Sequence, residues 1–278
     1  MEKFSILISS YGEKERLYAL IKTILQDNLK SKIEKIVIVT PDKDLLLPRS
    51  KKILLIREKF RKGKYYAIRL GLKFIKTKIV VMVSSDLKMR KNFLPFLVKY
   101  FNNKKIGMVV GRPLAEKSSR IYPFSKIIWE LHHLLCMKDP KGTEICAFRK
   151  IFNYFPKVSA DEVFIEYKIK KANFSVVYEP RAYGYTRIPY GLTHFFEQRK
   201  RCFIGHIFIW QKYRFTTSSV KLRNLLYLLA HYIKDIKNVN ELLKIIIILQ
   251  LELVARIYAL LEFLLLNKRE IIWKKFYD

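Results

Sequence analysis

Short apolar runs alternate with helical patterns through the first hundred residues, and this alternation limits the possible folds more than any other feature of the sequence. The apolar runs cover residues 4–8, 35–39, 52–56 and 79–83. Helical spacing of apolar residues covers 13–27 and 66–75. Strands separated by helices in this way are typical of a parallel sheet with helices on both faces. The sequence therefore predicts an α/β domain.

The rest of the chain divides into a mixed region and an apolar helical end. Residues 108–111 and 175–178 resemble strands, whereas 124–135 and 162–171 resemble helices. No repeat or linker rich in Pro, Gly or Ser interrupts the first 200 residues. Strongly apolar helices follow at 222–233 and 242–266. We therefore expect one catalytic-size domain over residues 1–210 and a C-terminal helical segment over 211–278.

The last predicted helix has one polar stripe and a broad apolar face. Its stripe contains Glu241, Lys244, Glu252, Arg256 and Glu262, which helical geometry places on one side. Its length exceeds the roughly 20 residues needed to span a bilayer, but charges within lipid cost several kcal/mol. We expect the segment to associate with a membrane, either in the interface plane or as a re-entrant helix packed by its polar stripe. A spanning helix and a helix buried in a soluble core are the alternatives.

The chain is strongly basic, with 55 Lys and Arg residues against 24 Asp and Glu residues and a net charge of +31. Residues 51–105 contain 17 basic side chains and two acidic ones, Glu58 and Asp86. Such a charge favours a polyanionic partner, which includes nucleic acid, anionic lipid and phosphorylated substrates. A generally Lys-rich composition without a dedicated partner is the alternative explanation.

Cysteine usage and the first residues predict a cytosolic setting. Cys136, Cys146 and Cys202 have neither disulfide-framework nor metal-ligand spacing, so they are expected to be reduced thiols. The first three residues lead directly into the strand at 4–8 rather than into the apolar core of a signal peptide.

Polar residues follow three of the predicted strands. These are Ser9-Ser10-Tyr11, Thr40-Pro41-Asp42 and Ser84-Ser85-Asp86. In open α/β sheets ligands bind beyond the carboxyl ends of the strands, so the three segments are expected to meet at one crevice. Asp86 is suited to hold a divalent cation against a diphosphate, although an Asp at this point can also cap the next helix.

Three further segments carry candidate functional groups. Asp161 and Glu162 begin a predicted helix, where one carboxylate can act as a general base or both can simply complement the helix dipole. Gln198 and Arg201 lie three residues apart on a helix, where an arginine can bind phosphate oxygens in a fork or belong to a solvated basic face. Lys64 follows Gly63 at a helix start, a position suited to phosphate.

The order of these segments resembles that of family 2 glycosyltransferases, inverting enzymes of the GT-A fold, over about residues 4–210. Residues 4–13 look like the family's first strand and nucleotide-contacting turn, and Gly63-Lys64 looks like its Gly-Lys segment. Ser84-Ser85-Asp86 stands in the place of the family's Asp-x-Asp, and Ala160-Asp161 in the place of its Glu-Asp pair. The stretch Gln198 to Cys202 is similar to the Gln-x-x-Arg-Trp motif of the membrane-associated branch.

The resemblance implies a role for each candidate residue. It makes Asp161 the catalytic base and Asp86 the ligand of Mg²⁺ or Mn²⁺. It assigns the nucleotide-sugar donor to a set of residues at the crevice: Ser9, Tyr11, Glu13, Asp42, Lys64, Ser84, Gln198 and Arg201. The chain departs from the pattern at Ser84, at Ala160 and at Cys202, which stand where the family has Asp, Glu and Trp.

The expected protein is thus a GT-A-type α/β enzyme with a mostly parallel twisted sheet and C-terminal membrane-associated helices. It would transfer a sugar from a UDP- or GDP-sugar to a lipid-linked or glycan acceptor at the cytoplasmic face of the cell membrane. Its partners would include an anionic membrane surface and no nucleic acid. The rival interpretations are a basic nucleic-acid-binding protein, a nucleotidyltransferase and an inactive relative of the glycosyltransferases.

Overall fold

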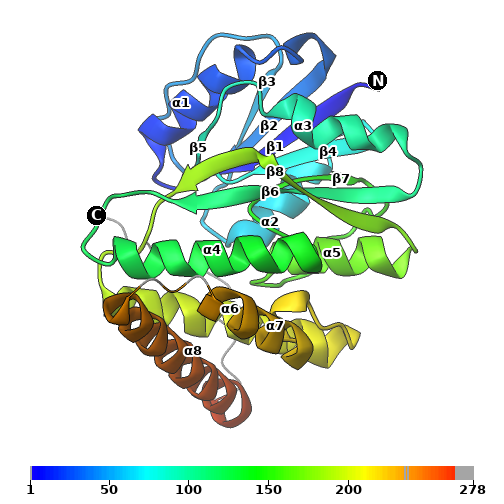
Figure 1. Cartoon of the computed structure of the whole chain (residues 1–278). Helices are drawn as coiled ribbons and strands as arrows, with labels where there is room; N and C mark the ends of the chain where they lie inside the picture. Colours follow the sequence, from blue (N-terminus) through cyan, green and yellow to red (C-terminus); the bar gives the residue numbers. More distant parts are fainter. Residues whose placement is uncertain (1, 235, 237, 267–278) are drawn as a thin grey trace.

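The computed structural model describes residues 2–234, 236 and 238–266. These residues form an α/β fold around one sheet, shown in Figure 1. The described part of the chain has eight strands in the order β3-β2-β1-β4-β7-β6-β8-β5. Their bounds are Phe4–Ser9 for β1, Ile33–Thr40 for β2, Ile53–Arg57 for β3, Ile79–Val83 for β4, Lys88–Met89 for β5, Ile106–Ala115 for β6, Ile145–Arg149 for β7 and Ser175–Thr186 for β8.

The α-helices begin and end close to their predicted positions where the sequence pattern was periodic. They are α1 (Lys14–Leu25), α2 (Lys64–Leu72), α3 (Leu94–Val98), α4 (Tyr122–Lys138), α5 (Asp161–Lys171), α6 (Leu192–Tyr213), α7 (Leu222–Lys234) and α8 (Val239–Leu266). Short 3₁₀ turns cover Lys30–Lys32, Lys99–Asn102 and Ser218–Val220. The predicted α/β class is confirmed, and α6 continues without a break through residue 210, where the sequence had suggested a boundary.

The sheet is mixed, which corrects the expectation of a mostly parallel one. Strands β3, β2, β1 and β4 are parallel to one another, as predicted. Strand β7, which was not predicted, runs antiparallel between β4 and β6. Helices still connect the later strands, but α4 leads from β6 to an antiparallel β7, whereas β8 pairs with β6 in parallel.

The two faces of the sheet are covered by different helices because successive side chains of a strand point to opposite sides. Ile6 and Ile8 of β1 pack with the buried faces of α1 and α3. Leu7, between them, packs with α2 and with a larger cluster that includes α5 and α6. Phe148 of β7 is completely buried in that second cluster. The carboxyl ends of β1, β2 and β4 are thereby fixed at one edge.

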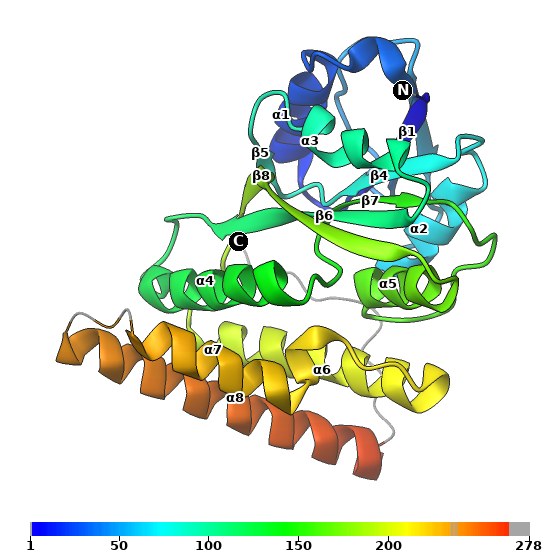
Figure 2. The same cartoon turned by 45° about the vertical axis from the view of Figure 1, so that its right-hand side comes forward.

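The C-terminal helices form a separate layer below the sheet. In Figure 2, α4 and α5 lie between the sheet and the layer made of α6, α7 and α8. Helix α8 packs along α6 by its polar stripe, where Arg199 and Lys200 of α6 pair with Glu252 and Glu262. Ala255 and Ala259, on the same side of α8, are completely buried.

The opposite side of α8 is apolar and exposed, and we call it the α8 apolar face. It consists of Leu242, Leu243, Ile246, Ile247, Leu249, Leu253, Val254, Ile257, Tyr258, Leu260, Leu261, Leu264 and Leu265, each at least 39% exposed. The polar stripe of α8 thus packs against α6 while its apolar side is exposed, so the helix is not buried in the core of the described residues; its association with a membrane stays a prediction. Across the residues described, no helix is long and apolar enough to cross a membrane.

Candidate active site

A hydrogen bond connects the segment that follows β2 with the turn that follows β1. The Oδ2 atom of Asp42 accepts a hydrogen bond of 2.7 Å from the backbone N–H of Gly12. Gly12 has a φ of 66°, a conformation that glycine adopts without strain. The oxygen of Asp42 therefore shapes the turn after β1. The predicted contact between Asp42 and a nucleotide base is not tested by this geometry and stays a prediction.

A cavity of about 630 Å³ opens at these strand ends and continues down to the C-terminal helices. Most of the residues predicted for the donor and the metal lie along its wall: Ser9, Tyr11, Glu13, Lys64, Ser84, Asp86, Gln198 and Arg201. Asp42 and Asp161 are not among its lining residues, whereas their sequence neighbours Pro41 and Glu162 are. The tertiary structure thus brings together residues as distant in the chain as Ser9 and Arg201.

Two arginines that the sequence did not single out hold the first-strand turn. The guanidinium of Arg61 lies 3.8 Å from the ring centre of Tyr11, in a cation–π contact. The Nη1 atom of Arg187 lies 3.4 Å from Oε2 of the buried Glu13. Both arginines line the cavity. They add positive charge beside the predicted donor residues, as a diphosphate ligand requires.

Lys64 connects the Gly-Lys segment with the two acids at the start of α5. Its ammonium lies 2.8 Å from Oδ2 of Asp161 and 2.6 Å from Oε1 of Glu162. Gly63, with a φ of 99°, provides the backbone turn that starts α2 at Lys64. The Asp161 side chain is 1% exposed and that of Glu162 is 18% exposed. Glu162 therefore faces the cavity, and Asp161 lies behind it against the same ammonium.

Burial and mutual repulsion set the protonation of this cluster. Burial, and then the charge of Glu162, raise the pKa of Asp161 to about 7 despite the opposing effect of Lys64. Burial also acts to raise the pKa of Glu162, but the attraction of Lys64 outweighs it and the net pKa is lowered. Burial opposes the charge of Lys64, yet the two carboxylates hold its pKa well above the usual value. A carboxyl group with a pKa near 7 is suited to general base catalysis.

Asp86 has a second carboxyl group as its neighbour, which the sequence did not predict. The antiparallel pairing of β4 and β7 places Glu144 there, and the backbone N–H of Ser84 donates to the Glu144 carbonyl at 3.2 Å. Burial first, and then the charge of Asp86, raise the pKa of Glu144 to about 8. Burial likewise raises the pKa of Asp86. The sequence feature that could have identified Glu144 as a site residue is its position directly before the apolar run Ile145–Phe148.

These two carboxyl groups fit a divalent cation. Partial burial of both makes their charges unfavourable unless a positive charge compensates, and the Oε1 atom of Glu144 is buried without a hydrogen-bond partner in the structure. Among the residues described, no group of three or more His, Cys, Asp or Glu side chains could hold a metal ion by itself. Diphosphate oxygens of a bound nucleotide would therefore have to complete the coordination, as is common for Mg²⁺.

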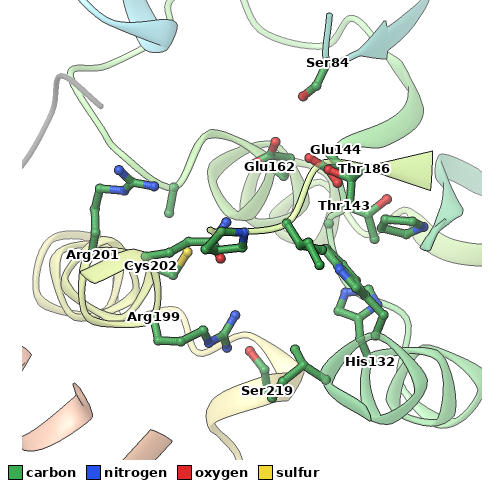
Figure 3. Close-up of a pocket in the computed structure, with 18 of the residues that line it drawn as sticks. Ser84, His132, Thr143, Glu144, Glu162, Thr186, Arg199, Arg201, Cys202 and Ser219 are labelled. Carbon is green, nitrogen blue, oxygen red and sulfur yellow. The ribbon is translucent and has the colours of Figure 1, made fainter. Parts of the chain in front are cut away.

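Helix α6 supplies the other wall of the cavity. Its Gly205 lies so close to Ala160 that a Cβ atom at residue 205 would come within 2.9 Å of the alanine Cβ. The small side chain at 160, where the family has Glu, is thus matched to the close approach of α6. Figure 3 shows Arg199, Arg201 and Cys202 of α6 on one side of the cavity, with Glu162 and His132 across from them.

His132 and His206 also line the cavity, and both are neutral. Burial, followed by the charges of Lys141 and Arg199, lowers the pKa of both histidines, that of His206 to about 3. Neither residue can therefore serve as a base of physiological pKa. Their low pKa therefore reflects burial first and the positive charges of Lys141 and Arg199 second.

Comparison with known proteins agrees with this geometry. The family model described as glycosyl transferase family 2 matches residues 5–155, slightly more than half of the chain. The chain belongs to this family. The match covers the strand-end turns and the carboxylates Asp86 and Glu144, and it ends six residues before Asp161. As a family 2 member, the protein is a glycosyltransferase, and the resemblance noted in the sequence is confirmed.

Solved structures show the same fold at low sequence identity. The mannosyltransferase PcManGT from Pyrobaculum calidifontis, in complex with GDP-Man and Mn²⁺, is 16% identical with a TM-score of 0.64; the alignment covers 96% of this chain and 88% of that one. Glucosyl-3-phosphoglycerate synthase from Mycobacterium tuberculosis, in complex with Mn²⁺, UDP and phosphoglyceric acid, is 12% identical with a TM-score of 0.50, covering 73% and 77%. No curated protein sequence matches the chain.

Proposed function

We propose that this family 2 glycosyltransferase moves a sugar from a UDP- or GDP-sugar, with inversion, to a hydroxyl of a lipid-linked or glycan acceptor. The observation that carries the proposal is the cavity itself. Its wall combines the strand-end turns, the carboxyl pair Asp86–Glu144 and the side chains of Lys64 and Glu162, with Asp161 directly behind them on the same ammonium. The similar structures named above contain a nucleotide or nucleotide-sugar together with Mn²⁺.

In this mechanism the acceptor oxygen bonds to the anomeric carbon as the bond from that carbon to the diphosphate breaks. The acceptor's proton passes to Asp161, and the nucleoside diphosphate leaves. Lys64 keeps the two acids of α5 in place and stabilises the remaining negative charge. Gln198 and Arg201 would contact the departing diphosphate. Mg²⁺ or Mn²⁺, held by Asp86 and Glu144, would neutralise charge on the diphosphate when bound.

Donor binding can be tested by thermal unfolding of the detergent-solubilised protein with UDP- and GDP-sugars, with and without Mn²⁺. We expect one donor to stabilise the protein only with the metal, by about 2.7 kcal/mol at a hundredfold excess over its Kd. Asp86→Ala should lose this response because the metal loses a ligand. Asp44→Ala, at an exposed Asp of the β2–β3 loop, should keep it. If Asp86→Ala responds like the wild type, Asp86 does not hold the metal.

The same titration separates the rivals. Stabilisation by nucleic acid in place of every donor would favour a basic nucleic-acid-binding protein. Stabilisation by nucleoside triphosphates alone, with release of pyrophosphate, would favour a nucleotidyltransferase. If none of these ligands stabilises the protein, it would be an inactive relative.

The α8 apolar face supports the further proposal that the protein lies on the cytoplasmic face of the cell membrane. The face contains thirteen exposed apolar side chains on one helix, and contiguous apolar patches of this kind mark interaction sites. Trp210 at the end of α6 is 51% exposed and stacks with the exposed Arg214, a pair suited to the interface between lipid and water. Because the chain has a net charge of +31, we expect the α8 apolar face to bind an anionic leaflet.

Vesicle co-sedimentation tests this proposal. We expect the protein to bind vesicles that contain anionic phospholipid. The double change Ile257→Asp and Leu261→Asp should release it, since each buried aliphatic side chain contributes roughly 1.5–3 kcal/mol. Both residues are about half exposed, so the changes should leave the fold intact. The double change Leu46→Asp and Phe60→Asp, at exposed apolar residues outside the C-terminal layer, is the control. Wild-type protein that stays in solution with these vesicles would contradict the proposal.

A further inference from the structure

The part of the cavity that lies below the predicted donor site has a different chemistry from the part at the strand ends. Its wall is formed by apolar residues of three helices: Leu131 and Leu135 of α4, Leu228 and Leu229 of α7, and Ile248 and Leu249 of α8. We call this part the apolar arm. Helices α7 and α8 lie beyond residues 5–155, which the family model matches. The donor and the catalytic carboxylates do not account for the arm.

The apolar arm reaches the α8 apolar face. Leu249 and Leu253 line the cavity and are also 39% and 60% exposed, so they belong to both surfaces. Ile245 and Ile248, on the neighbouring positions of α8, line the cavity and are buried. The apolar lining of the arm is therefore continuous along α8 with the α8 apolar face.

Positive charge lies between the apolar arm and the carboxylates. Arg199 and Arg256 both line the cavity and both pair with the single carboxylate of Glu252. Lys141 lines the same space. Two guanidinium groups that share one carboxylate leave an excess of positive charge, which suits a phosphate or diphosphate group. In Figure 3, Arg199 lies between the level of Glu162 and that of Ser219.

The three parts of the cavity thus have an order: carboxylates at the strand ends, arginines of α6 and α8, and then an apolar arm open to the α8 apolar face. We infer that the arm binds the hydrocarbon chain of an amphiphilic acceptor, with the acceptor's anionic group at Arg199 and its reacting end at Glu162 and Asp161. This inference rests on the proposed glycosyl transfer and specifies its acceptor. Glycans without a chain would leave the arm empty.

Cys202 provides a direct readout of occupancy. It lines the cavity and is partly exposed, whereas Cys136 and Cys146 are buried. The rate at which a maleimide labels Cys202 in the full chain can be measured with decyl phosphate, inorganic phosphate or decanol as the probe. We expect decyl phosphate to slow labelling at least tenfold at concentrations where inorganic phosphate and decanol have little effect. Equal protection by inorganic phosphate would reduce the site to an anion site and overturn the inference.

A change that fills the apolar arm should remove this protection. Leu229→Trp places a larger side chain in the arm, and we expect it to weaken protection by decyl phosphate at least tenfold. Leu226→Trp is the matched control, because Leu226 is 58% exposed on the same helix and does not line the cavity. Leu249→Trp, at a partly exposed residue of α8, is a second filling variant that guards against misfolding of the first. Protection that survives both filling variants would show that the chain binds elsewhere.

Donor binding measured on the same variants distinguishes the two proposals. A metal-dependent thermal shift with a nucleotide sugar, combined with no protection by decyl phosphate, would refute the acceptor arm and keep the glycosyl transfer. Protection by decyl phosphate without any donor response would support the arm and refute the proposed transfer. Leu229→Trp should keep the donor response, because Leu229 belongs to α7 in the C-terminal layer, whereas Asp86 follows β4 of the sheet.

Discussion

Asp161→Asn should lower kcat by roughly 10²–10⁴-fold, the usual contribution of a general base, with donor affinity nearly unchanged. Asparagine keeps the shape of the side chain but cannot accept the acceptor's proton. The Lys64–Glu162 pair remains to hold the site together. Single-turnover rates and donor titration on the same protein separate the chemical step from binding. Loss of donor binding in this variant would argue against a role for Asp161 as base.

The pH dependence of the same reaction provides a second check. The wild-type rate should rise with pH through an apparent value near 7, because the base must be ionised and the pKa of Asp161 is raised to about 7 by burial and Glu162. Glu162→Gln is the comparison variant, since Glu162 faces the cavity more directly. A greater loss of kcat in Glu162→Gln than in Asp161→Asn would assign the base to Glu162.

Lys64→Met should destabilise the fold by about 3–5 kcal/mol, the usual result of removing one partner of a buried ion pair. Methionine fills similar space, but Asp161 and Glu162 lose the ammonium that lies 2.8 and 2.6 Å away. Chemical denaturation at several pH values measures the effect. In this variant the folded-state pKa of both acids should rise above the unfolded values. The loss of stability should therefore be small at low pH and increase as pH rises through the folded-state pKa.

Adding Asp161→Asn and Glu162→Gln to Lys64→Met should recover most of the lost stability, because no uncompensated charge then remains buried. The single change Lys62→Met is a control, since Lys62 is an exposed residue of the same segment that contacts Tyr66. If the triple variant is as unstable as Lys64→Met, the loss comes from packing of the lysine chain and not from the carboxylates.

The local pattern of the sequence predicted most elements of the fold. Strands β1 to β4 are continuous apolar runs, and helices α1, α2 and α7 have apolar residues at helical spacing. Both patterns depend only on residues that are close together in the sequence, so they could be predicted without the tertiary structure. β7 was missed because its apolar run of four residues includes Cys146 and Ala147, and alanine has little preference for strands. The topology that follows from it, a mixed sheet, was missed for the same reason. Glu144 was missed with β7, since its role depends on pairing with β4.

The sequence alone also determined the family and the residue types of the site, because Lys64, Asp86, Asp161 and Arg201 occur in a recognisable order. Only the tertiary structure decided which atoms meet. It placed Glu162 in front of Asp161, tied Asp42 to Gly12 and joined the donor region to an apolar arm. It also turned the charged stripe of α8 inward and its apolar side outward. These features arise from contacts between segments that are distant in the chain. The free energies of such contacts cannot be predicted from a local pattern of residues.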